Sequence, residues 1–254
     1  MGKLAGKRAL VTAGGQGIGL AISRSLAEAG CHVCIHYFSS EVDLDALRAE
    51  WGLAEGQRLS SLQADLCRES EAASLVAHAV DSLGGLDILI NNAGSLVERR
   101  HLHEIDEPIY RKIMDLNLAS MAWVTQAAAP ALKAAGEASV VNLSSVAGRK
   151  GGHPGSLLYA TSKGAVLTWS RALATELAPD GIRVNAVAPG LILGTSFHAT
   201  HTTKESADAT IKGIPLGRAG CPEDVARAVC YLASEFDGFT TGATLDINGG
   251  VYSA

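Results

Sequence analysis

A tyrosine and a lysine four residues apart are placed for proton transfer. Tyr159 and Lys163 fall in a segment of helical spacing, where residues four apart project from one face. A carbonyl group that accepts a hydride develops negative charge on its oxygen, and a positioned phenol can donate a proton to that oxygen. We therefore predict that Tyr159 donates the proton and that Lys163, a neighbouring cation, favours the phenolate that remains.

A serine and an asparagine could complete the same site. Ser144 and Ser145 end a predicted strand before the helix of Tyr159, which brings a hydroxyl to the sheet edge where the phenol is expected. Asn117 is a polar residue in a mostly apolar helical segment, and it needs a partner if it is buried. We expect Ser145 to bind the substrate oxygen, and Asn117 to hold a water that links Lys163 to solvent.

A glycine-rich turn predicts a nucleotide site. The sequence Thr12-Ala13-Gly14-Gly15-Gln16-Gly17-Ile18-Gly19 follows the first predicted strand and opens a helix. Glycines let the backbone turn tightly and approach a pyrophosphate, whose charge then faces the N–H groups at the helix start. Any tight turn favours glycine, so the turn alone is weak evidence. Its place after the first strand favours a dinucleotide, with contacts from Gly14, Gln16, Gly17 and Ile18.

Residues after the other strands could bind the rest of the cofactor, because a ligand of an open parallel sheet lies beyond the carboxyl ends of the strands. Asp65 and Leu66 could hold the adenine end, and the run Asn91-Asn92-Ala93-Gly94 could form a floor for a flat ring. Singly, each is explained as well by a polar strand end. The predicted contacts are Ser39, Asp65, Leu66, Asn92, Ala93, Gly94, Pro189, Gly190 and Ile192, with Tyr159 and Lys163.

The elements that must position these residues alternate along the chain. The predicted strands are 8–12, 32–36, 59–64, 86–91, 139–144, 183–188 and 244–247, and the predicted helices are 18–29, 69–83, 110–135, 157–177 and 222–234. This order predicts an α/β fold, a three-layer Rossmann-type doubly wound parallel sheet of about seven strands. We expect residues 1–254 to form one domain that carries both the cofactor and the substrate sites, with a mobile loop or short helices over the site at 191–213.

The bulk composition excludes several classes of function. The net charge of -5 provides no positive field for nucleic acid or an anionic membrane. The start of the chain lacks the apolar region of a secretory signal, and Pro130 and Lys133 interrupt the most apolar stretch, so we expect a cytoplasmic protein without a membrane partner. Cys31 and Cys34 should point to opposite faces of a strand, and no metal is expected.

Taken together, these residues resemble the short-chain dehydrogenase/reductase family, in its single-domain form, over essentially the full chain. The resemblance rests on 12–19, 91–94, Asn117, Ser145, Tyr159-x-x-x-Lys163, Asn185, Pro189-Gly190, and Pro215-Leu216-Gly217-Arg218 before Pro222-Glu223-Asp224. It implies a catalytic tetrad of Asn117, Ser145, Tyr159 and Lys163, and interconversion of a secondary alcohol and a ketone with NAD or NADP and no metal. It also implies a homotetramer or dimer, with the long helices and the C-terminal strand at the interfaces.

Three positions depart from the family pattern. Ala13 stands where the family usually has glycine, although Gly14 and Gly15 offer freedom nearby, and Thr195 comes one residue later than the usual threonine. Tyr37 stands at the end of the second strand, where NAD-selective members carry an acid that binds the ribose hydroxyls and repels a 2′-phosphate. Because no acid stands at this place, NADP is tolerated. No arginine stands there either, so NADP is not strongly held. On balance the sequence favours NADP over NAD.

Basic side chains gather in the segments expected to border the mouth of the site. They are His101, His103, His153, His198 and His201, with Arg99, Arg100, Arg149, Lys150 and Lys204. In an acidic protein they indicate a local positive potential that would attract an anionic substrate such as a keto acid or sugar acid, unless these are ordinary solvated loops.

Two other functions remain open. A 3-oxoacyl-[acyl-carrier-protein] reductase is the nearest alternative, although the turns at 134–137 and 178–180 lack the basic residues that an acidic carrier would need. A cofactor-binding regulator without turnover belongs to another class, and the complete tetrad disfavours it.

Overall fold

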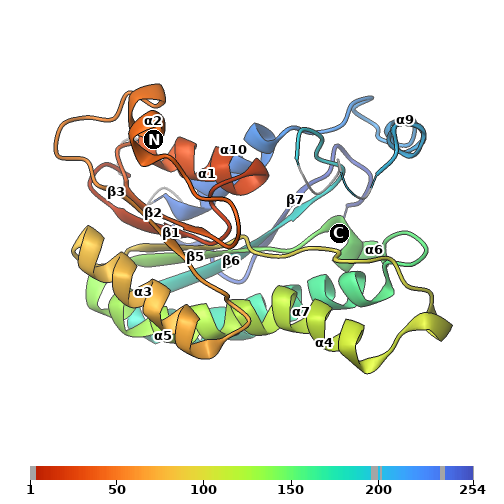
Figure 1. Cartoon of the computed structure of the whole chain (residues 1–254), viewed down its shortest axis with the longest axis horizontal. Helices are drawn as coiled ribbons and strands as arrows, with labels where there is room; N and C mark the ends of the chain where they lie inside the picture. The colour runs from red at the N-terminus through yellow and green to blue at the C-terminus, as the bar shows by residue number, and fades with distance from the viewer. Residues whose placement is uncertain (1–3, 196–199, 201, 235–237, 254) are drawn as a thin grey trace.

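The chain, seen in a computed structural model, folds around a seven-stranded sheet in which every neighbouring pair of strands is parallel. The structure describes residues 4–195, 200, 202–234 and 238–253. The strand order is β3-β2-β1-β4-β5-β6-β7 (Figure 1). The strands are β1 (Arg8–Val11), β2 (His32–Tyr37), β3 (Leu59–Gln63), β4 (Ile88–Asn91), β5 (Ala138–Leu143), β6 (Ile182–Pro189) and β7 (Thr244–Ile247).

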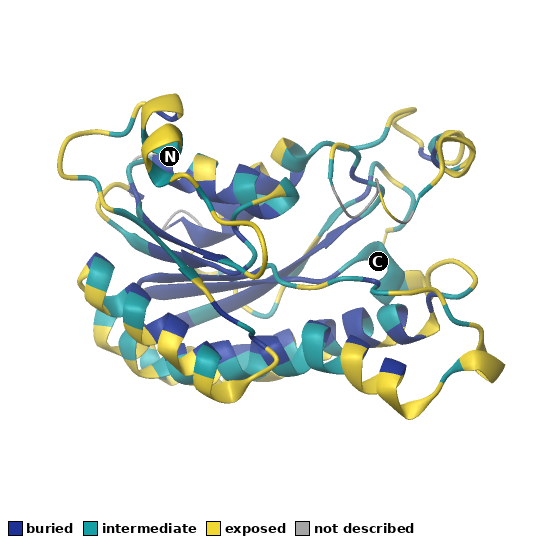
Figure 2. Ribbon diagram, viewed as in Figure 1, coloured by how far each residue is buried: buried dark blue, intermediate teal, exposed yellow. Residues whose placement is uncertain are grey.

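Helices cover both faces of this sheet and make the fold three-layered (Figure 1). One face carries α1 (Gly17–Glu28), α2 (Leu44–Glu50) and α10 (Pro222–Ala233). The other carries α3 (Glu69–Leu83), α4 (Glu107–Met114), α5 (Ser120–Ala135) and α7 (Leu157–Leu177). Two apolar clusters fill the spaces between the layers, and Figure 2 shows the sheet buried between helices whose outer faces are exposed. The doubly wound fold predicted from the alternating pattern is therefore confirmed.

Burial on both faces explains why several strands are apolar almost throughout. β4 and β5 are buried at every position, as strands covered by helices on two sides must be. Cys31 packs in the cluster beneath α1 and α10, whereas Cys34 packs in the cluster beneath α3 and α5. The two thiols therefore lie on opposite faces of the sheet, as expected, and both are free.

The long helix predicted from 110 to 135 differs in detail. α4 begins at Glu107, because the Asp106 carboxylate accepts the N–H of Ile109 and caps the helix there. A π-helical turn, η2 (Asp115–Ala119), then separates α4 from α5 and contains Asn117. Such turns insert one extra residue into a helix and occur frequently at functional sites. Apolar spacing alone could not reveal this insertion.

Several short helices and turns were not among the predicted elements. They are α2, α6 (Val146–Lys150), α9 (Lys204–Ile211) and the 3-10 turns η1 (Leu102–Glu104) and η3 (Ala178–Asp180). The segment 191–213 contains α9, which agrees with the short helices expected there, while 196–199 and 201 lie outside the described residues.

The topology decides where a site can form. β1 and β4 lie side by side although two strands separate them in sequence, so the chain reverses direction across the sheet at this point. Ligands of open α/β sheets bind beyond the carboxyl ends of the strands at such a reversal. Within the described ranges, no helix has the length and apolarity that crossing a membrane requires.

Candidate active site

Lys163 is held deep in the protein beside the end of β5. Its side chain is 4% exposed, and its Nζ donates to the carbonyl oxygen of Leu143 at 2.9 Å. Ser144 binds the backbone of α7 at the same residue, because its Oγ donates to the carbonyl oxygen of Lys163 at 2.7 Å. Burial lowers the pKa of Lys163 to about 8, since the charged form loses water that one carbonyl does not replace. An ammonium so placed can exchange a proton near neutral pH.

Tyr159 lies one helical turn before Lys163 and faces Ser145. The Lys163 Nζ is 5.9 Å from the centre of the Tyr159 ring. Burial raises the pKa of Tyr159, and its hydrogen bond with Ser145 partly opposes this. The protein's own groups therefore keep the phenol protonated, which is the form that can donate a proton. Ser145 is the N-cap of α6, where its Oγ accepts the N–H of Ala147 at 3.1 Å.

Asn117 approaches Lys163 across the glycine that follows β4. A Cβ built on Gly94 would stand 2.7 Å from the Asn117 Oδ1 and 2.8 Å from the Lys163 Nζ. The amide of Asn117 binds the backbone, with Oδ1 accepting the N–H of Ser95 at 3.1 Å and Nδ2 donating to the carbonyl oxygens of Ser95 and Ile113. The four predicted catalytic residues are thus brought to one edge of the sheet, and Asn117 also holds the loop after β4.

The glycine-rich turn lies at the same edge and meets the start of α1. Gln16 is the N-cap of α1, its side chain does not cap the helix, and no acid stands in the first turn. Gly14 donates its N–H to the carbonyl oxygen of His36 at 2.9 Å and accepts from the Ser23 Oγ at 3.1 Å. Thr195 packs over Gly17, whose φ is +51°, and Ile18 packs against the core beneath α1. This helix start therefore has the electrostatic character of an anion site, with neither a side-chain cap from Gln16 nor an acid in its first turn.

Ala13, rather than the glycines beside it, takes the left-handed conformation in this turn. Its φ is +48°, while neither Gly14 nor Gly15 has a positive φ. The expected compensation by the neighbouring glycines therefore does not occur, because hydrogen bonds hold Ala13 itself in place. The Asn92 Nδ2 donates to the carbonyl oxygens of Thr12 and Ala13, both at 3.0 Å.

The polar residues after β4 have structural partners, unlike the open floor expected from two amides. Asn91 points into a buried network, where its Nδ2 donates to the Thr125 Oγ1 at 3.0 Å and to the Asn142 Oδ1 at 2.8 Å. The Thr12 Oγ1 accepts the N–H groups of Asn92 and Ala93 at 2.8 and 3.0 Å. The small residues Ala93 and Gly94 remain at the sheet edge beside Lys163, so the floor is formed by backbone.

The residues predicted to bind the adenine end follow β2 and β3, and two of their side chains have structural partners. Ser39 is exposed just after β2. Asp65 accepts the N–H of Cys67 at 3.0 Å and lies 3.5 Å from the Arg68 Nε, so its carboxylate is already partnered. Leu66 is 4% exposed and packs in the core. Leu66 could contact a nucleotide through its backbone alone.

The segment after β6 packs closely against the residues at the end of β7. Pro189 is the last residue of β6, and Gly190 donates its N–H to the carbonyl oxygen of Ile247. A Cβ on Gly190 would stand 2.9 Å from that of Asn248, so only glycine fits there. Ile192 is 2% exposed and forms an isolated bridge with Gly220. Its side chain is part of the core and only its backbone borders the site.

The donor set of this edge fits a nicotinamide dinucleotide. The start of α1 has no side-chain cap from Gln16 and no acid in its first turn, which suits a pyrophosphate. Uncharged small residues follow β4 and β6, which suits an amide-bearing ring. No group of three or more histidine, cysteine or acidic side chains with metal-binding geometry occurs among the residues that the structure describes.

Three of the basic side chains near the mouth are already paired with carboxylates. Arg149 binds Asp246 through two nitrogens at 3.1 and 3.0 Å, Arg100 pairs with Glu98 and Lys204 with Asp208. Lys150 and His153 are exposed, as are His101 and His103, whose rings stack. His198 and His201 lie outside the described residues. The positive potential predicted from the sequence therefore depends on a few exposed side chains, and Lys150 is the lysine among them.

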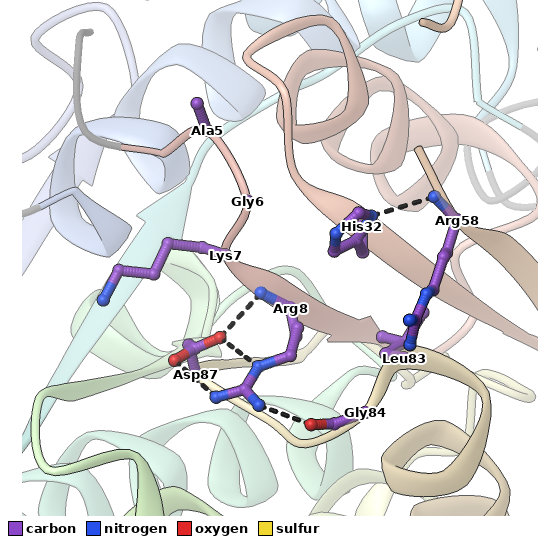
Figure 3. Close-up of a pocket in the computed structure, with 9 residues that line it drawn as sticks. All are labelled: Ala5, Gly6, Lys7, Arg8, His32, Arg58, Leu83, Gly84 and Asp87. Carbon is purple, nitrogen blue, oxygen red and sulfur yellow. Dashed lines mark hydrogen bonds and ion pairs between the residues drawn. The ribbon is translucent and has the colours of Figure 1, made fainter. Parts of the chain in front are cut away.

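A cavity of about 490 Å³ lies at the amino ends of the strands, opposite the carboxyl ends where the candidate active site forms (Figure 3). Arg8, His32 and Asp87 line it at or just before the first residues of strands. The Arg8 guanidinium is occupied by the Asp87 carboxylate, at 2.7 and 3.0 Å, and by the Gly84 carbonyl oxygen. This cavity is therefore remote from Tyr159 and forms no part of the candidate active site.

Comparison with known proteins agrees with this geometry. A family model described as enoyl-(acyl carrier protein) reductase matches residues 12–252. The chain is 39% identical to an uncharacterized oxidoreductase of Methylorubrum extorquens, covering 99% of this chain and all of that protein. It is 35% identical to a 3-oxoacyl-[acyl-carrier-protein] reductase of Staphylococcus aureus, covering 97% and 98%.

Solved structures show the same fold. An NADH-dependent reductase responsible for alginate metabolism superposes with a TM-score of 0.89 at 33% identity, covering 99% of each chain. A structure of that reductase complexed with NAD superposes with a TM-score of 0.86. The chain belongs to the short-chain dehydrogenase/reductase family. It is accordingly an NAD(P)-dependent oxidoreductase that acts on an alcohol or a carbonyl group.

Proposed function

We propose that the chain interconverts a secondary alcohol and a ketone on a small polar or anionic substrate, a keto acid or sugar acid, with Tyr159 as the proton donor or acceptor. The observation that carries this proposal is the Tyr159 phenol, hydrogen-bonded to Ser145 and beside a buried Lys163, at the sheet edge where the glycine-rich turn also lies. The nicotinamide cofactor supplies the hydride. The remaining chemistry, which is the delivery and return of one proton, falls to residues of the chain.

Each of the four predicted residues has a role in this reaction. Ser145, hydrogen-bonded to Tyr159, would also bind the substrate oxygen and orient it toward the phenol. Lys163 stabilises the phenolate after proton transfer, and its lowered pKa suits it to pass a proton onward. Asn117 fixes the loop after β4 through Ser95 and would hold a water near Lys163.

The cofactor contacts follow from the same edge. Gly14, Gln16, Gly17 and Ile18 would receive the pyrophosphate, while Ser39, Asp65 and Leu66 would border the adenosine. The nicotinamide would lie among Asn92, Ala93, Gly94, Pro189, Gly190, Ile192, Tyr159 and Lys163. The donors at the start of α1 support the first assignment, and the small residues after β4 support the last.

The choice between NADP and NAD depends on the end of β2. Phe38 is 65% exposed there and Ser39 follows it, so this end of the strand neither repels a 2′-phosphate nor binds it with a cation. We keep NADP as the favoured cofactor, while the NADH-dependent structural relative supports NAD. Both cofactors should therefore be accepted, with the higher kcat/KM for NADPH.

An anionic substrate is supported from two directions. Lys150 is exposed at the last residue of α6, the short helix that Ser145 caps, and His153 is exposed just after that helix ends. The structural relative is described as an NADH-dependent reductase responsible for alginate metabolism. A spectrophotometric screen of NADH and NADPH oxidation against keto acids, uronate-derived ketones and cyclic ketones tests the proposal. Turnover with the carboxylated ketones, abolished in Tyr159→Phe, is the expected result.

A 3-oxoacyl thioester is the alternative substrate, since a relative of 35% identity reduces such substrates by name. The turn at η3 does not present a free cation to an acidic carrier, because Lys133 pairs with Asp180 at 2.7 Å. Acetoacetyl thioesters belong in the same screen, and a kcat/KM for them above that of every keto acid would favour the alternative. Binding of cofactor without any turnover would favour a regulator.

We further propose that the chain is one domain, assembles as a homotetramer and works in the cytoplasm. β7 is an edge strand in the described sheet, with Leu245 39% exposed, and Tyr231 of the adjacent α10 is 54% exposed. Such apolar side chains beside an open strand edge are a suitable surface for a second copy. Analytical ultracentrifugation tests the assembly, and a single cooperative unfolding transition tests the domain prediction.

A further inference from the structure

We infer that His36 is a positioning residue of the dinucleotide site, and that it holds Ala13 in the conformation that the glycine-rich turn requires. The inference rests on the proposed binding of a nicotinamide dinucleotide at this turn. His36 lies within β2, next to β1, and is 3% exposed. Both hydrogen bonds of its ring go to backbone groups, so the role of this buried histidine is found in what those groups do.

Both ring nitrogens of His36 are used. The backbone N–H of Ala13 donates to Nδ1 at 2.9 Å, and Nε2 lies 3.0 Å from the carbonyl oxygen of Ala64. An amide N–H can only donate and a carbonyl oxygen can only accept, so Nδ1 must be the bare nitrogen and Nε2 must carry the hydrogen. The ring is therefore neutral and fixed in one tautomer.

Ala13 needs this support because of its backbone conformation. Its φ of +48° is in the left-handed region, which an L side chain disfavours. The carbonyl oxygen of Ala13 accepts from the Asn92 Nδ2 and touches Gly19 of α1 so closely that a Cβ there would overlap it. A return of Ala13 to negative φ would rotate this carbonyl and shift the turn against the start of α1.

His36 also joins the two ends of the cofactor site. Its ring bridges the turn after β1 and Ala64, which directly precedes Asp65 and Leu66. The backbone carbonyl of His36 accepts the N–H of Gly14 at 2.9 Å, so the same residue binds two consecutive N–H groups of the turn. Of these two hydrogen bonds, only the one from Ala13 depends on the side chain. A substitution of His36 can therefore remove it and leave the bond from Gly14 in place.

Two substitutions separate the two bonds of the ring. An asparagine oxygen can occupy the place of Nδ1 and accept from Ala13, whereas a glutamine amide reaches the place of Nε2 and keeps only the bond to Ala64. We expect His36→Asn to bind NADH with a Kd within about threefold of the parent chain, and His36→Gln to weaken binding about tenfold. Isothermal titration of the full chain with NADH, and in parallel with NADPH, measures both.

Ala13→Gly provides the decisive rescue, because glycine takes a positive φ without support. Combined with His36→Gln it should restore most of the lost affinity, and in urea unfolding of the cofactor-free chain it should recover most of the lost midpoint. Simple addition of the two single effects in both measurements would overturn the inference. If the parent chain binds neither NADH nor NADPH, the proposed function is wrong, and the unfolding cycle alone still decides whether His36 supports Ala13.

Discussion

Gly94 and Lys163 approach each other so closely that a single methyl group on the glycine would stand 2.8 Å from the ammonium nitrogen. The two residues are far apart in sequence, on the loop after β4 and on α7. The same methyl group would stand 2.7 Å from the Asn117 Oδ1. The glycine thus sets the space in which the buried cation and the amide face the candidate active site.

Gly94→Ala should therefore displace Lys163 and lower kcat about tenfold or more, because a shift of about 1 Å in a catalytic group is costly. Gly213→Ala is the matched control, since a Cβ there makes only an ordinary contact of 3.5 Å with Thr210. Steady-state kinetics of both variants test this. Full activity of Gly94→Ala would mean that Lys163 tolerates displacement or takes no part in the reaction.

Lys163→Met should abolish turnover without destabilising the fold. Burial lowers the pKa of Lys163 to about 8, so the folded state holds this cation at a cost that methionine does not carry. Between pH 8 and the ordinary lysine pKa of about 10.4 the unfolded chain binds the proton and the folded chain does not, so stability from this group rises with pH there. Denaturant unfolding at pH 7 and pH 10 should show the parent gaining stability relative to Lys163→Met. A parent that loses stability relative to the variant would contradict this.

Asp224→Asn should cost about 1–2 kcal/mol of stability, as loss of a helix cap does. The Asp224 carboxylate pairs with Arg218 at 2.8 Å and with Arg227, and it accepts the N–H of Cys221 at 3.0 Å. The Arg218 guanidinium holds the pKa of Asp224 well below its usual range. The stabilisation is complete above the unfolded pKa of about 3.9 and is lost as pH falls further. The difference between parent and variant in urea unfolding should shrink from pH 6 toward pH 3.

Lys150→Gln should change the kinetics of the enzyme, whereas Arg149→Gln should change its stability. Lys150 is exposed, so its loss should lower kcat/KM for a carboxylated ketone a few fold through KM, less so at high salt. Arg149 is 13% exposed and paired with Asp246, so its loss should cost about 1–3 kcal/mol of stability by leaving a carboxylate unpaired. Kinetics at two ionic strengths and thermal unfolding separate the two effects. An unchanged KM in Lys150→Gln would refute electrostatic attraction of the substrate by this residue.

Phe38→Arg should raise the preference for NADPH over NADH about tenfold, because it places a cation at the exposed end of β2 where a 2′-phosphate is expected. Phe38→Asp should shift the preference the other way. The ratio of kcat/KM for the two cofactors is the measurement. Equal ratios in all three proteins would place the 2′-hydroxyl away from this strand end.

The sequence predicted the architecture well for a physical reason. Strands covered on both faces must be apolar, and the connecting helices have an apolar stripe, so β4, β5 and α3 are recognisable from local pattern alone. The spacing of Tyr159 and Lys163 is equally local, because one turn of helix suffices to bring them together. Prediction was weaker where the apolar spacing carries no signal, as at the π-helical turn that contains Asn117.

What the chain itself determined, then, is the order of strands and helices, the glycine-rich turn and the pairing of phenol with ammonium on α7. The tertiary structure alone decided which polar residues face the ligand and which hold the scaffold. Asn91 and Asn92 are adjacent in sequence, yet one binds a buried network and the other binds the turn at Ala13, because successive side chains at a strand end point to opposite sides of the sheet. The role of His36 becomes visible only in the tertiary structure, because β2 lies beside β1 there. The N–H group that its ring accepts belongs to Ala13, in a distant part of the chain.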